Sequence, residues 1–181
     1  MKHLKKSSLL AFLLIFAMFF AVSCDVAQEE DYTDTDNSET SSFVDVPNNL
    51  IGTWEFNGQW TESYTITKDT FSSAGSYAGN NAKVYKTSET SGYIYIQYTK
   101  AANADWTYSE TAPDVGKWYA ISYKDLTDST LKLSGAYKAD GKAAVATIDE
   151  AKVEFTIENG YFSAYSELTK NNLNYHGCGY L

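Results

Sequence analysis

Short runs in which apolar and polar residues alternate occupy most of the chain. Trp54 and Phe56 share one side of a predicted strand at 51–57, and Thr53 and Glu55 share the other side. A period of two places successive side chains on opposite faces of a β-strand. The same pattern predicts further strands at 60–66, 69–74, 82–87, 93–100, 118–124, 129–136 and 161–168.

Turn residues separate these runs at regular intervals. Asn57-Gly58 is a strong hairpin signal, because both central residues of a type I′ turn need a positive φ. Strands of five to eight residues at regular spacing are typical of a barrel or a two-sheet sandwich. We predict an all-β fold with at most one short helix: a single antiparallel up-and-down β-barrel of about eight strands, with a sandwich as the alternative. Closure of the barrel removes exposed strand edges.

One segment carries signals for two kinds of structure. Thr147 with Glu150 three residues later has the spacing of a helix capping box. Val153, Phe155 and Ile157 then alternate as in a strand and lead to Asn159-Gly160, a second hairpin pair. We therefore predict a short helical turn that runs into a strand at 152–158.

The charge of the chain limits its partners. The chain has 23 acidic residues, 14 lysines and no arginine, with a net charge of −9. An acidic surface repels phosphate backbones, and a chain without arginine lacks the guanidinium group that binds phosphate through two hydrogen bonds. We therefore exclude nucleic acid as a partner.

The first 24 residues have the order of an export signal. Lys2, Lys5 and Lys6 precede an unbroken run of 14 apolar residues, Leu9 to Val22. A membrane-spanning helix needs about 20 apolar residues, so this run is too short to be a span. The small residues before Cys24 complete a segment that resembles the signal of bacterial lipoproteins. In that family the peptide is removed, and the cysteine, here Cys24, becomes an N-terminus that carries acyl chains such as palmitate.

This resemblance implies three parts of the chain: a signal peptide at 1–23, a lipidated tether at 24–47 and a barrel domain at 48–181. The tether contains eight acidic residues and no lysine, a composition that disfavours folding. Cleavage would remove three lysines and no acid, which changes the net charge from −9 to −12. We expect a protein of the bacterial cell envelope that its acyl chains hold in the outer membrane or at the cell surface.

A second resemblance rests on the start of the domain. The segment 48–54, Asn-Asn-Leu-Ile-Gly-Thr-Trp, together with the strand rhythm, looks like the opening of lipocalins and related calycin barrels. In that family the Gly-x-Trp motif begins the first strand, the tryptophan closes one end of the barrel, and a late arginine packs across it. This chain has no arginine. The composition is also similar to that of small spirochaetal lipoproteins with lipocalin-like domains.

The sequence carries no catalytic signature. His176 and Cys178 lie close together in a glycine-containing tail, and no second Cys/His pair completes a zinc site. Glu55 and Glu62 are interpreted as surface residues of a hairpin. We expect a protein that is not an enzyme and that has no cofactor and no metal site.

The remaining candidate site is aromatic. The chain has 15 tyrosines, and the predicted strands at 93–100 and 118–124 concentrate them. A tyrosine has an apolar body and a polar tip, so a wall of tyrosines suits a wet cavity or a sugar-stacking surface, although cross-strand pairing can also explain it. The candidate ligand-binding residues are Tyr93, Tyr95, Tyr98, Tyr119 and Tyr123.

Two functions of different class follow. In the first, the barrel holds a small apolar or glycan ligand in a tyrosine-lined mouth. In the second, a barrel with a filled interior is displayed at the surface and contacts host or envelope proteins. The interior separates them, because an eight-stranded barrel is just wide enough to fill itself with side chains or to hold one small ligand. A filled interior would be plugged by five side chains: Trp54, Phe56, Ile94, Ile96 and Phe155.

Overall fold

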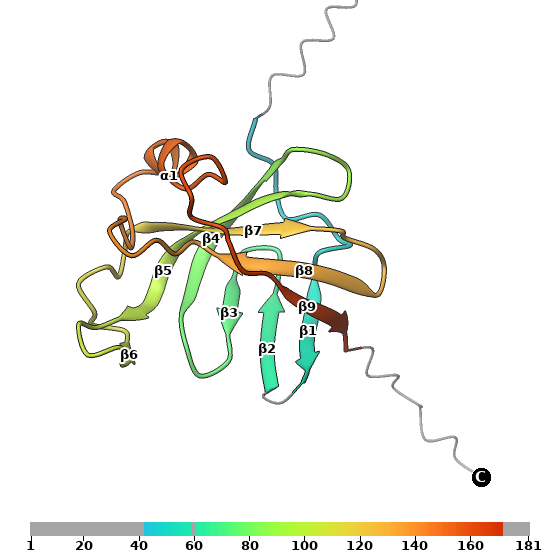
Figure 1. Cartoon of the computed structure of the whole chain (residues 1–181), viewed down its shortest axis with the longest axis horizontal. Coiled ribbons are helices and arrows are strands. Elements are labelled where there is room, and N and C mark those ends of the chain that lie inside the picture. The colour runs from blue at the N-terminus through green and yellow to red at the C-terminus, as the bar shows by residue number, and fades with distance from the viewer. Residues whose placement is uncertain (1–41, 59–60, 172–181) are drawn as a thin grey trace, which may run out of the picture. The chain divides into compact units, whose positions relative to one another are not determined.

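The protein is a closed antiparallel β-barrel of eight strands with one short helix (Figure 1). The computed structural model describes residues 42–58 and 61–171. The barrel strands are β1 (Gly52–Asn57), β2 (Thr61–Ile66), β3 (Phe71–Ser73), β4 (Ala78–Lys86), β5 (Gly92–Ala102), β7 (Trp118–Lys124), β8 (Thr130–Gly135) and β9 (Ser166–Lys170). A two-residue strand, β6 (Tyr108–Ser109), pairs with the end of β5, and α1 (Ile148–Glu154) lies between β8 and β9.

Each barrel strand pairs with its neighbours in the chain. The order is β4-β3-β2-β1-β9-β8-β7-β5, and an additional β4–β5 ladder closes the ring. The first strand pairs with the last one at Trp54↔Lys170 and Glu55↔Thr169. Sequential neighbours with closure between the first and last strands confirm the predicted up-and-down barrel, since a sandwich would need crossed connections.

The alternating strand direction gives the barrel two different ends. The connections β2–β3, β4–β5 and β7–β8 are tight turns of four or five residues, and they share one end with the start of β1. We call this the short-turn end. The connections β1–β2, β3–β4, β5–β7 and β8–β9 lie at the opposite end. Two of them are long: β5–β7 covers residues 103–117, and β8–β9 covers residues 136–165. We call this the long-loop end.

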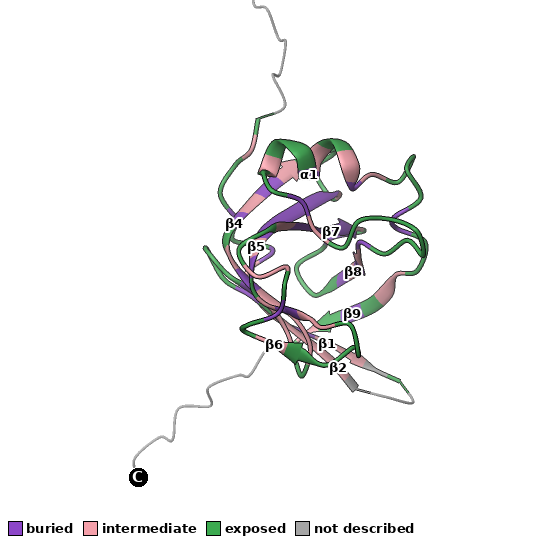
Figure 2. Ribbon diagram, turned by 90° about the vertical axis from the view of Figure 1, so that its left-hand side faces the viewer, coloured by how far each residue is buried: buried purple, intermediate pink, exposed green. Residues whose placement is uncertain are grey.

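The barrel interior is apolar and packed. Cross-strand partners such as Ile94↔Ile121 and Leu131↔Leu168 put buried residues on the same face of successive strands. Alternation of this kind lets one face of each strand contribute to a common core. Figure 2 shows buried residues along β4, β5 and β7, whereas exposed residues gather on the loops and on one side of α1.

A second layer covers the outside of β4, β5 and β7. Phe43 packs edge-on against Tyr95, with ring centroids 5.4 Å apart, and Val44 exchanges two backbone hydrogen bonds of 2.8 Å with Val84. Val46 is buried. The expected start of the domain at residue 48 is therefore too late, because apolar residues at 43–46 pack on the barrel within a segment that was read as tether. The remaining tether at 25–41, the signal peptide and Cys24 lie outside the described residues, as do His176 and Cys178.

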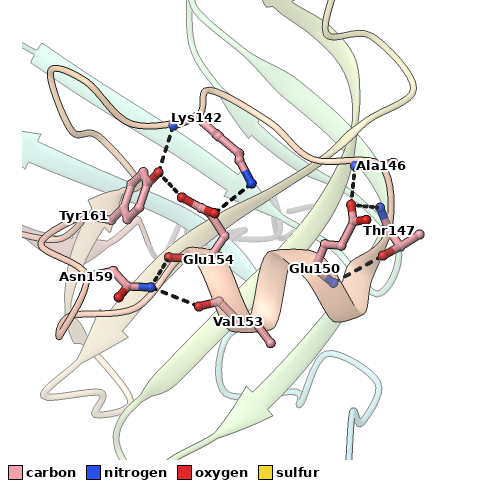
Figure 3. Close-up of polar contacts among 8 residues, drawn as sticks. All are labelled: Lys142, Ala146, Thr147, Glu150, Val153, Glu154, Asn159 and Tyr161. Atoms are coloured by element: carbon pink, nitrogen blue, oxygen red, sulfur yellow. Dashed lines mark hydrogen bonds and ion pairs between the residues drawn. The ribbon is translucent and has the colours of Figure 1, made fainter.

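The segment that follows Thr147 is a helix, and the predicted strand at 152–158 is wrong. Thr147 and Glu150 form the complete capping box (Figure 3). Beyond the helix, the Asn159 amide donates to the carbonyl oxygens of Val153 and Glu154 at 3.0 and 2.8 Å. These bonds satisfy two backbone acceptors that a helix end leaves open, so Asn159-Gly160 ends a helix and does not form a hairpin.

Two other predicted strands differ from their predicted bounds by four or more residues at one end. β4 begins at Ala78, four residues before the prediction, because a register shift between Asn80 and Lys83 interrupts the alternation, with Asn81 at φ 53°. The last strand covers only Ser166–Lys170, and Tyr161 and Phe162 are buried in the loop before it. Among the described residues, no helix is long and apolar enough to cross a membrane.

Candidate functional site

The short-turn end of the barrel is closed by Trp54. Its indole Nε1 donates to the Leu50 carbonyl oxygen at 2.9 Å, and both residues are fully buried. The Lys170 ammonium lies 5.0 Å from the centre of the indole ring, a distance at which a cation is attracted to an aromatic face. Lys170 thus stands where the lipocalin resemblance implies an arginine.

The motif glycine makes room for this lysine. Gly52 has φ +148°, and a methyl group at its Cα would lie 2.5 Å from Lys170 Cε. A side chain at this position would therefore force both a strained backbone and a displaced lysine. The Gly-x-Trp segment therefore serves to close this end of the barrel.

At the long-loop end three tyrosines pack together inside the barrel. Tyr98 and Tyr119 stack with their ring centroids 4.9 Å apart, and Tyr77 meets Tyr119 edge-on at 5.3 Å. The Tyr77 hydroxyl reaches to within 3.3 Å of the place where a side chain of Gly135 would begin. Since Tyr77 comes from the β3–β4 connection and Gly135 from β8, on the far side of the ring, the Tyr77 side chain crosses the interior.

These tyrosines are held neutral. Burial raises the pKa of Tyr77 and of Tyr119 well above the ordinary value of 10.0, and the neighbouring tyrosines raise both further. Burial also raises the pKa of Tyr98. Neutral phenols can both donate and accept hydrogen bonds, so the cluster is a polar lining within an otherwise apolar core.

Glu62 lies on the inner face of β2, where Tyr64 and Phe71 connect it to this cluster. It is the cross-strand partner of Phe56, and Tyr64 is the partner of the buried Trp54. The Glu62 Oε2 atom accepts hydrogen bonds from the Tyr64 hydroxyl at 2.9 Å and from Ser166 Oγ at 2.7 Å. Burial, followed by the bond to Glu62, raises the pKa of Tyr64. The expectation that Glu62 is a surface residue of the hairpin is therefore wrong.

The structure divides the five predicted site tyrosines among three places. Tyr98 and Tyr119 belong to the cluster at the long-loop end. Tyr93 and Tyr95 point to the other side of β5, where Phe162 and Phe43 cover them at centroid distances of 5.5 and 5.4 Å. Tyr123 is buried further along β7, beside Gly92, and burial raises its pKa to about 12. The five residues form no common wall.

The exposed aromatic residues lie on the long loops. Trp106, Tyr108 and Tyr137 are 70%, 36% and 63% exposed, and we call these three residues the aromatic rim. Trp106 occupies the turn between β5 and β6, and Tyr137 follows β8. Sequence reasoning missed all three. The turn-forming run Asn-Ala-Asp-Trp at 103–106 is the signal that could have identified Trp106 as a loop residue.

A hydrogen-bond network holds Trp106 in place. The Trp106 backbone N–H donates to the Asn103 carbonyl oxygen at 3.0 Å, and the Asn103 N–H donates to the Thr107 carbonyl oxygen at 2.7 Å. Asp105 Oδ1 accepts from the Thr107 hydroxyl at 2.6 Å, and these bonds lower the pKa of the Asp105 carboxyl. Trp106 itself has φ +64°, a conformation that is a genuine outlier for a bulky side chain.

Four of the five side chains that were expected to plug a filled interior are completely buried. Trp54, Ile94, Ile96 and Phe155 have no exposed surface, and Phe56 is half-buried. The described interior is thus filled by its own side chains from the short-turn end to the tyrosine cluster.

Comparison of the chain with models of protein families, with curated proteins and with solved structures found no match. The function of the site therefore has to be inferred from its own geometry.

Proposed function

We propose that the protein is a lipid-anchored interaction module of the bacterial envelope, whose filled barrel presents the aromatic rim to a partner protein. The packed interior supports this class of function over a ligand carrier, because the space that a lipocalin-type ligand would need is occupied by Trp54, Ile94 and Ile96. The export signal and Cys24 supply the anchor.

The observation that carries the proposal is Trp106. An indole that is 70% exposed gains nothing from the core of its own domain. Its positive φ costs of order 1–3 kcal/mol, and strain of this kind persists where the surrounding bonds over-determine it and clusters at functional sites. Tryptophan and tyrosine are also the residues most enriched among interface hot spots. A tryptophan whose backbone is held by hydrogen bonds at a loop tip loses little backbone freedom on binding.

The charge around the rim indicates the chemistry of the partner. Asp105 precedes Trp106, and Glu110 follows Tyr108 within the same excursion. The described surface is part of a chain with a net charge of −9, so an acidic partner would be repelled. We therefore propose a neutral or basic protein surface, from the envelope or from a host.

A second candidate function is binding of a small polar ligand at the long-loop end. The half-buried Tyr64 and Tyr77, together with Glu62, favour it, because their polar atoms face the barrel interior. A glycan that stacks on Tyr77 and donates to Glu62 fits this lining better than an apolar ligand does.

Native mass spectrometry of the protein purified from its own cells separates the two functions. The interaction module should appear as the acylated chain without a small-molecule adduct that depends on Glu62. A discrete adduct that the Glu62→Gln variant loses would contradict the proposal and support the second candidate. The Thr99→Val variant, altered at an exposed position of β5, serves as the control for handling and folding.

A further inference from the structure

A groove on the barrel wall lies apart from the aromatic rim. It has a volume of about 610 Å³ and is lined by β1, β8, β9 and the β7–β8 turn. Sites for small molecules commonly have about 300–1,000 Å³, so the groove is large enough for one.

The groove follows from incomplete pairing of the first and last strands. β1 and β9 form a ladder over only two residue pairs, Trp54↔Lys170 and Glu55↔Thr169. These pairs join the end of β9 to the middle of β1, and Figure 1 shows β9 running at an angle to β1. The lining accordingly includes inner-face residues, Phe56, Leu131 and Leu168, beside outer-face residues such as Glu55 and Thr169.

Ion pairs and a rigid turn arrange the polar side of the groove. Lys132 Nζ lies 3.1 Å from Asp125 Oδ2 and 3.0 Å from Glu167 Oε1, and so holds both carboxylates. The hydroxyls of Thr127 and Thr130 lie 2.7 Å apart across the β7–β8 turn. Asp125 adopts φ 54°, a left-handed conformation that aspartate tolerates better than most residues. The ion pairs and the turn therefore bring these polar groups together on one side of the groove.

From this lining we infer that the groove is a binding site for a neutral saccharide. Its carboxylates are strong acceptors for sugar hydroxyls, and Lys132 and the threonine hydroxyls supply donors. The half-buried Phe56 offers apolar surface to the C–H face of a sugar ring, and the buried Leu131 and Leu168 complete the apolar part of the lining. The charged side chains of the lining are three carboxylates, of Glu55, Asp125 and Glu167, and the Lys132 ammonium. The excess of negative charge disfavours an anionic ligand, and the ammonium, which pairs with two of the carboxylates, disfavours a cationic one.

The site is independent of the proposed protein interaction. None of its lining residues belongs to the aromatic rim, and the groove includes the β7–β8 turn at the short-turn end. A saccharide site on the barrel wall would let the same domain bind a glycan there while the long-loop end contacts a protein.

NMR titration of the isotope-labelled chain, expressed without residues 1–23, tests this inference. The probes are N-acetylglucosamine and maltotriose as neutral saccharides and glucuronate as an anion. We expect saturable shifts of the amides at 125–132 and 167–169 with at least one neutral saccharide, and weaker binding of glucuronate. The Thr169→Val variant, which removes one groove hydroxyl from a strand position that tolerates valine, should bind about two- to tenfold more weakly.

Matched variants make each result decisive. Thr99→Val makes the same chemical change on the outer surface of β5 and should leave the titration unchanged, as should Trp106→Ala on the rim. Thr169→Tyr fills the groove and should abolish the shifts. The inference is overturned if no neutral saccharide gives saturable shifts at the groove, if the shifts map to the long-loop end, or if Thr169→Val and Thr99→Val bind equally well.

Discussion

Replacement of Gly52 by alanine should destabilise the barrel through two separable effects. The first is backbone strain, since φ +148° lies where a side chain costs of order 1–3 kcal/mol. The second is contact with the Lys170 side chain, because the new methyl group would lie 2.5 Å from Cε. Relief of that contact moves the ammonium away from Trp54 and loses a cation–π interaction of about 1 kcal/mol. The Gly52→Ala variant should therefore lose about 3 kcal/mol of unfolding free energy.

A double-mutant cycle isolates the second effect. In a Lys170→Ala background the methyl group meets no lysine stem, so Gly52→Ala should cost about 1 kcal/mol less than in the wild type. In a Lys170→Met background a side chain of similar length remains but the ammonium is absent, so no cation–π interaction is left to lose and Gly52→Ala should again cost about 1 kcal/mol less. Urea unfolding followed by far-UV circular dichroism measures all of these values. Additivity of Gly52→Ala and Lys170→Ala to within about 0.5 kcal/mol would refute the proposed contact.

Three further predictions concern the ends of the chain and the buried tyrosines. Deletion of residues 42–47 should lower the thermal midpoint by several degrees, because burial of Val46 alone contributes about 2 kcal/mol, whereas deletion of 25–41 should leave the midpoint unchanged. Stability should be nearly constant between about pH 7 and 9 and fall between about pH 10 and 12, because tyrosines ionise near 10 in the unfolded chain while burial raises the pKa of Tyr123 to about 12; urea midpoints at pH 8 and 11 that agree would contradict this. The Cys24→Ser variant should leave the detergent phase for the aqueous phase, and a processed variant that still partitions into detergent would disprove lipidation.

The strand pattern could be read from the sequence because each barrel strand has one face in the core. Trp118–Lys124 was predicted with its observed bounds, and the strands on either side of Asn57-Gly58 do pair. The predicted two-residue turn is wrong, because Asn57 is still a strand residue paired with Thr61. The pattern at 152–158 misled for a physical reason. Of its three apolar residues, Phe155 is buried, but Val153 is 75% exposed and Ile157 is 54% exposed, so the alternation did not reflect a buried face.

The candidate site was harder to predict, since alternation shows which side chains share a face but not which face is inside. Both faces of β5 are buried: Ile94 and Ile96 lie in the core, whereas Tyr93 and Tyr95 lie under Phe43 and Phe162. The covering residues come from segments about 50 or more positions away in the chain, and no local pattern reveals them. Glu62 was interpreted as a surface residue for the same reason. Its hydrogen-bond partner Ser166 lies 104 residues away in the chain, so no local pattern shows that its carboxylate faces the barrel.

The central claim is that the long-loop end contacts a protein through Trp106. Replacement of Trp106 by a photo-reactive phenylalanine analogue on intact cells tests this most directly. The control carries the same analogue at the exposed Glu89, in the β4–β5 turn at the short-turn end. We predict a discrete crosslinked protein from position 106, none from position 89, and loss of that product when Tyr108 is also changed to alanine. Equal crosslinking from both positions, or none from position 106 in a correctly exported protein, would contradict the proposed function.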